Sequence, residues 1–166
     1  MATPAEWATG YARQALADCR TFDLLQTLRV PECHKLQFLQ MTCEKLVKAH
    51  LCGEGWDPIR LQTSHAFVKK HLPAVIRQQA EFVNFTGSQA KKVLKNVRHL
   101  AQEIDVLAPA VKRGGQRPDN CEYPWEDGNQ VLRVPIDCSF YPSLLLEYSG
   151  RTFLKLVRGA IQQLLH

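Results

Sequence analysis

The stretch from Pro31 to Leu51 constrains the fold more than any other, because it is long, uninterrupted and strongly periodic. Pro31 suits the first turn of a helix, where its missing N–H costs nothing, and neither Gly nor Pro follows before the stretch ends. Glu44 and Lys48 lie one turn apart in the favourable order and are expected on an exposed side, where the pair adds little stability. Apolar residues at helical spacing predict a core-facing stripe of Cys33, Leu36, Leu39, Cys43, Leu46 and Val47.

Helical patterns cover most of the remaining chain. Thr3 and Glu6 form a capping box that predicts a first helix reaching about Leu28. A short turn then leads into the next helix, so the two are expected to pack as an antiparallel hairpin. Pro73 either kinks a helix or starts the next one, and Gly150 can divide the last. Apolar periodicity predicts the later helices over residues 63–72, 73–84, 88–107 and 143–166.

The segment from about residue 109 to 142 differs from the rest, because it holds most of the turn-forming residues and has little helical periodicity. Residues 130–134 can form one short strand with little to pair with. A segment of this length without regular structure is unusual in a compact domain, which indicates either a function or an ordered excursion from the bundle.

Composition narrows the class of protein. A chain of 166 residues with 45% hydrophobic content favours one domain. The absence of an eighteen-residue apolar run argues against a membrane span, and the N-terminus lacks a signal-peptide pattern, so we expect a cytoplasmic protein. The net charge of +5 permits an acidic partner such as RNA or a nucleotide.

The sequence predicts no metal and no cofactor. The six cysteines form no Cys-x-x-Cys pair, and reduced cysteines on apolar faces behave as small hydrophobes. His50 and Cys52 could offer two ligands, but nothing nearby completes a tetrahedral set. Ser-His-Asp, Gly-rich phosphate-loop and His-Glu-x-x-His motifs are also absent from the sequence.

One pattern in the first half of the chain resembles the HEPN superfamily of small helical domains. In that family a helix reading Gln-x-x-x-Glu-Lys-x-x-Lys-Ala precedes a Ser/Thr-His start to the next helix. The matching residues here are Gln40, Glu44, Lys45, Lys48 and Ala49, followed by Thr63, Ser64 and His65. The resemblance implies an up-and-down helical bundle, a homodimer and a role in a toxin-antitoxin, defence or stress context.

For the ribonucleases of that superfamily, the resemblance implies a catalytic pair of Arg60 and His65. A 2′-hydroxyl must lose a proton as it attacks phosphorus, which suits His, while Arg offsets the developing charge without a metal. Roughly one such Arg–His spacing is expected by chance, and Arg29 with His34 is a second match. The alternative for His65 is a helix-start residue that hydrogen-bonds within the bundle.

Other HEPN-like proteins accompany a nucleotidyltransferase or bind nucleotides without cutting RNA. For that class the resemblance implies a basic surface on the predicted helix 88–107, extended by two arginines of the insertion. The alternative is a solvated polar face, which any amphipathic helix has. The candidate RNA- or nucleotide-binding residues are Lys91, Lys92, Lys95, Arg98, His99, Arg113 and Arg117.

Tyr123 and Trp125 form a further candidate site in the insertion. Their rings can stack on a base or enter the pocket of a protein partner, which would make the chain a structural interaction domain. The alternative is that they fold back over the core of the bundle. Glu122 stands where family members often carry Arg, which argues against a phosphate contact there.

The prediction from sequence is therefore an all-α, HEPN-like bundle of four to five helices with one long irregular insertion. The leading function is a nucleotide- or RNA-associated module. A metal-independent endoribonuclease and a protein-interaction domain are the two alternatives.

Overall fold

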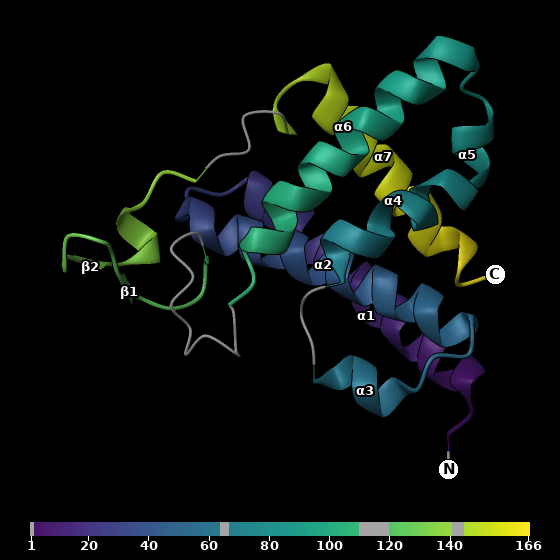
Figure 1. Cartoon of the computed structure of the whole chain (residues 1–166), viewed down its shortest axis with the longest axis horizontal. Helices are drawn as coiled ribbons and strands as arrows, with labels where there is room; N and C mark the ends of the chain where they lie inside the picture. Colours follow the sequence, from purple (N-terminus) through teal and green to yellow (C-terminus); the bar gives the residue numbers. More distant parts are fainter. Residues whose placement is uncertain (1, 64–66, 110–119, 141–144) are drawn as a thin grey trace.

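The two N-terminal helices of the computed structural model form the predicted antiparallel hairpin (Figure 1). The structure describes residues 2–63, 67–109, 120–140 and 145–166. Helix α1 (Pro4–Gln26) begins with the capping box, in which the Thr3 hydroxyl accepts the Glu6 N–H at 3.2 Å and the Glu6 carboxylate accepts the Thr3 N–H at 2.6 Å. It ends slightly before the predicted Leu28. Helix α2 (Glu32–Gly53) follows, and the two helices make the most extensive helix–helix contact of the fold.

The later helices complete an all-α bundle, as the sequence predicts, although their ends differ from the prediction. Helix α4 contains Pro73 in its interior, and α7 passes through Gly150 without a break. The predicted helix 73–84 is instead divided at Gln79 between two helices. The elements are α3 (Pro58–Gln62), α4 (Val68–Gln78), α5 (Ala80–Val83), α6 (Gly87–Val106) and α7 (Tyr148–Gln163).

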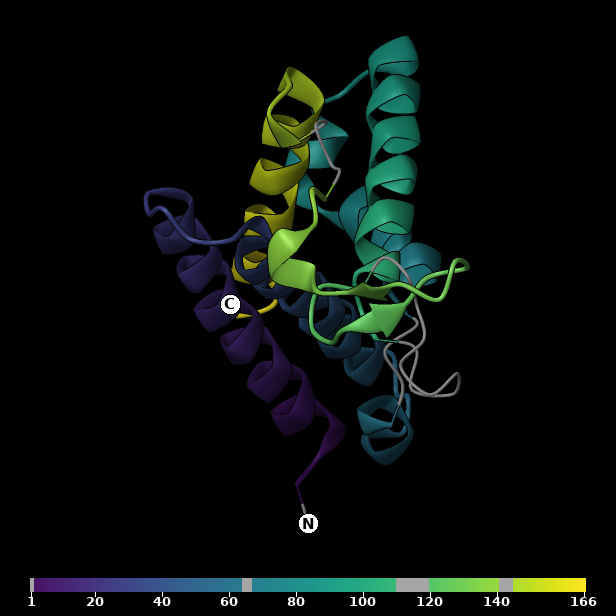
Figure 2. The same ribbon diagram turned by 90° about the vertical axis from the view of Figure 1, so that its left-hand side faces the viewer.

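The described part of the insertion holds a small hairpin. Strand β1 (Trp125–Glu126) pairs antiparallel with β2 (Leu132–Arg133), so the predicted strand has a partner, and a 3₁₀ helix, η2 (Pro135–Asp137), follows. The Asp127 carboxylate holds the turn by accepting the Asn129 N–H at 2.8 Å and the Arg133 Nε–H at 2.8 Å. The hydrogen bond from the Arg133 side chain is the main cause that lowers the pKa of Asp127. Figure 2 shows this segment lying across one side of the bundle.

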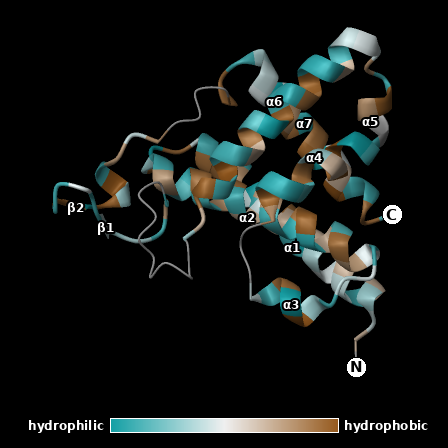
Figure 3. Ribbon diagram, in the orientation of Figure 1, coloured by the Kyte–Doolittle hydropathy of each residue, from teal (hydrophilic) through white to brown (hydrophobic). Residues whose placement is uncertain are grey.

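Helix α2 lies at the centre of the core, because it contacts α1, α4, α6 and α7. The apolar residues predicted for its inner face are all buried, and Figure 3 shows hydrophobic and hydrophilic residues alternating along the helices. The expectation that Glu44 and Lys48 lie on an exposed side is wrong: they are only 6% and 4% exposed. A helix surrounded by neighbours has no fully solvated face for such a pair. None of the described helices is long and apolar enough to span a bilayer.

Candidate functional site

The residues that carry the family resemblance form a buried polar network on α2. The Glu44 carboxylate accepts a hydrogen bond from Lys48 Nζ at 2.6 Å and one from Gln40 Nε2 at 2.9 Å. Lys45 reaches across to α1, where its Nζ lies 2.7 Å from the Asp18 carboxylate. The contacts of Glu44 pair its buried charge within α2, and the Lys45–Asp18 contact joins α1 to α2. We assign this network to the architecture of the hairpin.

The structure places only one member of the predicted catalytic pair. Arg60 lies on α3, its side chain is 89% exposed, and its Nε is 3.8 Å from the Asp57 carboxylate. Asp57 caps the same helix by accepting the Ile59 N–H at 3.0 Å. His65 lies outside the described residues, so the structure gives no distance between the two side chains.

The predicted basic residues of α6 are all exposed, but they face different surroundings. Arg98 lines a cavity between α4 and α6, whereas Lys92 lines a separate cavity between α6 and α7. Lys91, Lys95 and His99 line neither of these two cavities. Arg113 and Arg117 lie outside the described residues.

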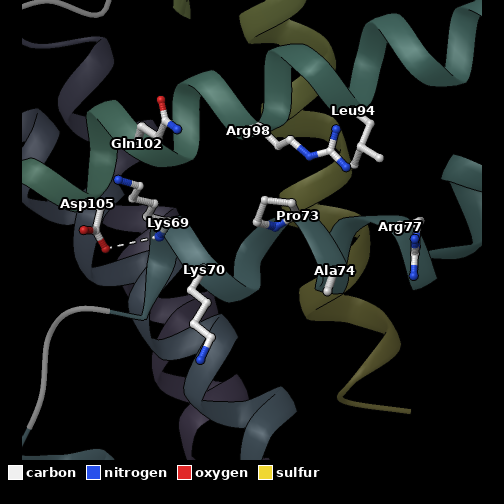
Figure 4. A pocket seen from close by; sticks show the side chains of 9 residues that line it. All are labelled: Lys69, Lys70, Pro73, Ala74, Arg77, Leu94, Arg98, Gln102 and Asp105. Atoms are coloured by element: carbon white, nitrogen blue, oxygen red, sulfur yellow. Dashed lines mark hydrogen bonds between the residues drawn. The ribbon is translucent and has the colours of Figure 1, made fainter.

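The cavity between α4 and α6 has more cationic lining residues than the α6–α7 cavity or the cavity beside Trp125 (Figure 4). We call it the α4–α6 groove. It has a volume of about 690 Å³. Figure 4 shows Arg98 on the α6 side with its guanidinium near Leu94 and Pro73 of α4 opposite, whereas Lys70 and Arg77 extend from α4 on the side away from α6. Its lining residues are Lys69, Lys70, Pro73, Ala74, Arg77, Leu94, Arg98, Gln102 and Asp105.

The cations of α4 lie on its outer surface because the opposite face of the helix packs in the core. Val68, Leu72, Val75 and Ile76 are buried, so polar side chains between them are left on the outer surface. Lys70 and Arg77 are seven positions apart, two turns of a helix, which puts them on the same side. The sequence shows this spacing, but it left open whether Pro73 kinks one helix or starts another, so it did not place the two residues on one helix.

The electrostatics of the α4–α6 groove favour an anion. Among the described residues that line it there are four cations and one carboxylate, that of Asp105. Asp105 is 6% exposed and accepts the Lys69 backbone N–H at 3.1 Å, so part of its hydrogen-bonding capacity is used within the protein. Positive side chains around a concave surface concentrate anions there. No group of three or more His, Cys, Asp or Glu side chains that could hold a metal occurs among the described residues.

Tyr123 and Trp125 differ in accessibility. The Tyr123 ring is 55% exposed, whereas Trp125 is 8% exposed and packs at the base of the β1–β2 hairpin. Trp125 also lines a cavity of about 610 Å³ together with Asp127 and Arg133. Tyr123 is therefore the more accessible of the two rings for stacking or docking. Trp125 is instead buried against the protein.

The cysteines offer no activated nucleophile. All six are free, and only Cys138 is partly exposed. Burial raises the pKa of Cys121 to about 12 and raises that of the fully enclosed Cys43 as well, which keeps both thiols protonated at neutral pH.

Comparison with known proteins identifies no relative. No protein-family model, no curated protein and no solved structure matches the chain.

Proposed function

We propose that this protein is an RNA- or nucleotide-binding helical module that holds phosphate groups in the α4–α6 groove. The observation that carries the proposal is that Lys69, Lys70 and Arg77 of α4 and Arg98 of α6 line one concave surface. Arg and Lys at such a surface bind phosphate oxygens by charge-assisted hydrogen bonds. The net charge of +5 adds long-range attraction for a polyanion.

The lining of the α4–α6 groove favours contact with the sugar-phosphate backbone. Its lining residues among those that the structure describes include no aromatic side chain on which a base could stack, and the apolar ones are small or aliphatic. Binding there would be tolerant of RNA sequence and would weaken as salt rises, because each phosphate that the protein neutralises releases counterions.

The biological setting follows from the HEPN resemblance and belongs to the same proposal. It comprises a cytoplasmic homodimer acting in a toxin-antitoxin, defence or stress context, with a nucleotidyltransferase as a candidate partner. Sedimentation of the purified protein tests the dimer. Incubation of a mixed RNA pool in EDTA, with His65→Ala as the comparison, tests whether binding is accompanied by metal-independent cleavage using Arg60 and His65.

Fluorescence anisotropy of a labelled single-stranded RNA, titrated at several salt concentrations, tests the α4–α6 groove. We expect Arg77→Gln with Arg98→Gln to weaken binding and to reduce the slope of log K against log salt by about 0.7 for each phosphate that the variant no longer neutralises. Arg13→Gln with Arg20→Gln is the matched control, because both residues are exposed on α1 and the change in net charge is the same.

The two double variants separate a local contact from a general charge effect. A larger drop in affinity and slope for the Arg77 and Arg98 pair supports the α4–α6 groove as the binding surface. Equal drops for both pairs would show that net charge alone attracts the RNA. No salt-dependent binding by the wild-type protein would refute the proposal.

A further inference from the structure

Three cysteines that are far apart in the sequence meet where the insertion packs on α2. Cys33 lies in the first turn of α2, whereas Cys121 and Cys138 lie near the two ends of the described part of the insertion. Cys33 interacts electrostatically with both of the others. All three are free thiols in this structure, so the fold brings together groups that are able to form a disulfide.

Contacts on either side of Cys138 hold the end of the insertion on the start of α2. The 3₁₀ helix η2 ends one residue before Cys138 and contacts α2 (Figure 2). Beyond Cys138, the Phe140 backbone N–H donates to the Glu32 carboxylate at 3.3 Å. Glu32 precedes Cys33 directly, and Phe140 lies two residues after Cys138. The thiols of Cys33 and Cys138 therefore share one small region of the molecule.

These two thiols differ in their access to solvent. Cys138 is partly exposed, and its Sγ lies 3.3 Å from the Val134 carbonyl oxygen. It also lines the cavity of about 610 Å³ beside Trp125, so a small reagent reaches it from solution. Cys33 is only 1% exposed. A reagent therefore meets Cys138 first, and Cys33 reacts only from within the protein.

The surroundings of Cys33 suit it better than Cys121 to the internal step. Burial raises the pKa of the Cys33 thiol, but the backbone N–H groups of Cys33 and His34 act in the opposite direction, because they favour the thiolate. Burial raises the pKa of Cys121 to about 12, and its Sγ–H donates to the Leu107 carbonyl at 3.4 Å. Cys33 is therefore the better internal nucleophile of the two.

We propose that Cys33 and Cys138 form a reversible disulfide that joins the end of the insertion to the first turn of α2. The oxidant is a small disulfide such as glutathione disulfide. The Cys138 thiolate attacks one of its sulfurs, which breaks the S–S bond, forms a mixed disulfide on Cys138 and releases one glutathione thiolate. The Cys33 thiolate then attacks the Cys138 sulfur and releases the second.

The exchange balances without any further reactant. Two protein thiols are oxidised to one disulfide, one glutathione disulfide is reduced to two thiols, and the protons of the protein thiols pass to the released thiolates. No activated thiol is required, because solvent reaches Cys138 and the second step is intramolecular. The inference is independent of the proposed function, since neither Cys33 nor Cys138 is among the described residues that line the α4–α6 groove.

Incubation of the folded protein with glutathione disulfide at pH 8, followed by mass spectrometry, tests the inference. We expect the intact protein to lose two hydrogen atoms, and a digest without reductant to contain the peptides of Cys33 and Cys138 joined by a disulfide. The bridged form should exceed the mixed disulfide on Cys138 by about tenfold or more, because the attack by Cys33 is intramolecular. Reduced glutathione should reverse the reaction.

Three variants assign the roles. Cys33→Ala should retain one glutathione on Cys138, because the internal nucleophile is missing, and Cys138→Ser should lose the rapid reaction. Cys121→Ala is the matched control, because Cys121 is also buried and also interacts with Cys33, and it should still form the bridge. Circular dichroism confirms that each variant is folded.

The wild-type digest decides the inference without any variant. Cys138 that keeps its glutathione, stays unmodified or is joined to Cys121 would overturn it. The bridge closes a long loop of the chain, which restrains the unfolded state, so the oxidised wild-type protein should melt at a higher temperature than the reduced one. The same treatment should leave the melting temperature of Cys138→Ser unchanged. A bridged protein that melts no higher than the reduced protein would contradict the fastening of the insertion to α2.

Discussion

Removing Lys48 should destabilise the protein far more than removing an exposed cation. In the folded chain Lys48 Nζ donates to the Glu44 carboxylate at 2.6 Å, and the two side chains are only 5% and 8% exposed. Lys48→Met keeps a long, flexible side chain but removes the positive charge that Lys48 places beside the buried Glu44 carboxylate. Breaking a buried ion pair in this way costs about 3–5 kcal/mol.

The matched control is Arg158→Met. Arg158 binds Asp23, and the two side chains are 44% and 43% exposed. Water already solvates both charges, so this change should cost only about 0–1 kcal/mol. The expected contrast between the two variants therefore comes from burial and not from the removal of a salt bridge as such.

Urea denaturation followed by circular dichroism measures both free energies of unfolding. For a chain of this size, the destabilisation by Lys48→Met corresponds to a fall in melting temperature of roughly 6–20 °C. The double variant Glu44→Gln with Lys48→Met should recover much of the stability, because the buried carboxylate is then replaced by a neutral amide. A destabilisation by Lys48→Met no larger than that by Arg158→Met, or a double variant less stable than Lys48→Met, would refute the reasoning.

Three further outcomes are expected. At pH 8 a disulfide reagent should label the thiol of Cys138 rapidly, and Cys138→Ser should remove this fast phase. Rapid labelling of Cys43 would contradict the burial of that thiol in the core. Burial lowers the pKa of His71 below 6.5, so as the pH falls the unfolded chain takes up the proton first and the folded state loses stability. His71→Gln should therefore reduce the drop in melting temperature between pH 7 and pH 5. An unchanged drop would contradict this role of His71. Gly159→Ala should lower the free energy of unfolding, measured by urea denaturation, by about 1–3 kcal/mol, because the added methyl group meets the buried Gln79 side chain. A gain in stability, which is usual for Gly→Ala in a helix, would show that the Gln79 side chain moves aside.

The existence of the long helices could be predicted from sequence, because one face of each is apolar at helical spacing. Their ends were less predictable where local and tertiary preferences conflict. Pro73 indicates a helix end, yet Leu72, Val75 and Ile76 continue one buried face past it, so packing carries α4 through the proline.

The burial of Glu44 and Lys48 could not be predicted from their spacing, because a favourable i,i+4 pair looks the same on an exposed or a buried face. The signal lies in the whole of α2, where 13 of 22 residues are buried. That fraction results from neighbours on several sides, which one helix does not reveal. For the same reason the sequence indicated Arg98 as a candidate, but not the residues of α4 that the fold brings beside it.

The α1–α2 hairpin also has a consequence for assembly. Its contacts, including the bridge between Lys45 and Asp18, join two helices connected only by residues 27–31. The same contacts would form equally well if α1 of one chain packed against α2 of a second, because no contact depends on the connection itself. What favours the closed form is the high effective concentration that a short connection provides. A change that shortens or stiffens residues 27–31 until they can no longer make the turn would remove that advantage, and the hairpin surface would then link two molecules by exchange of α1.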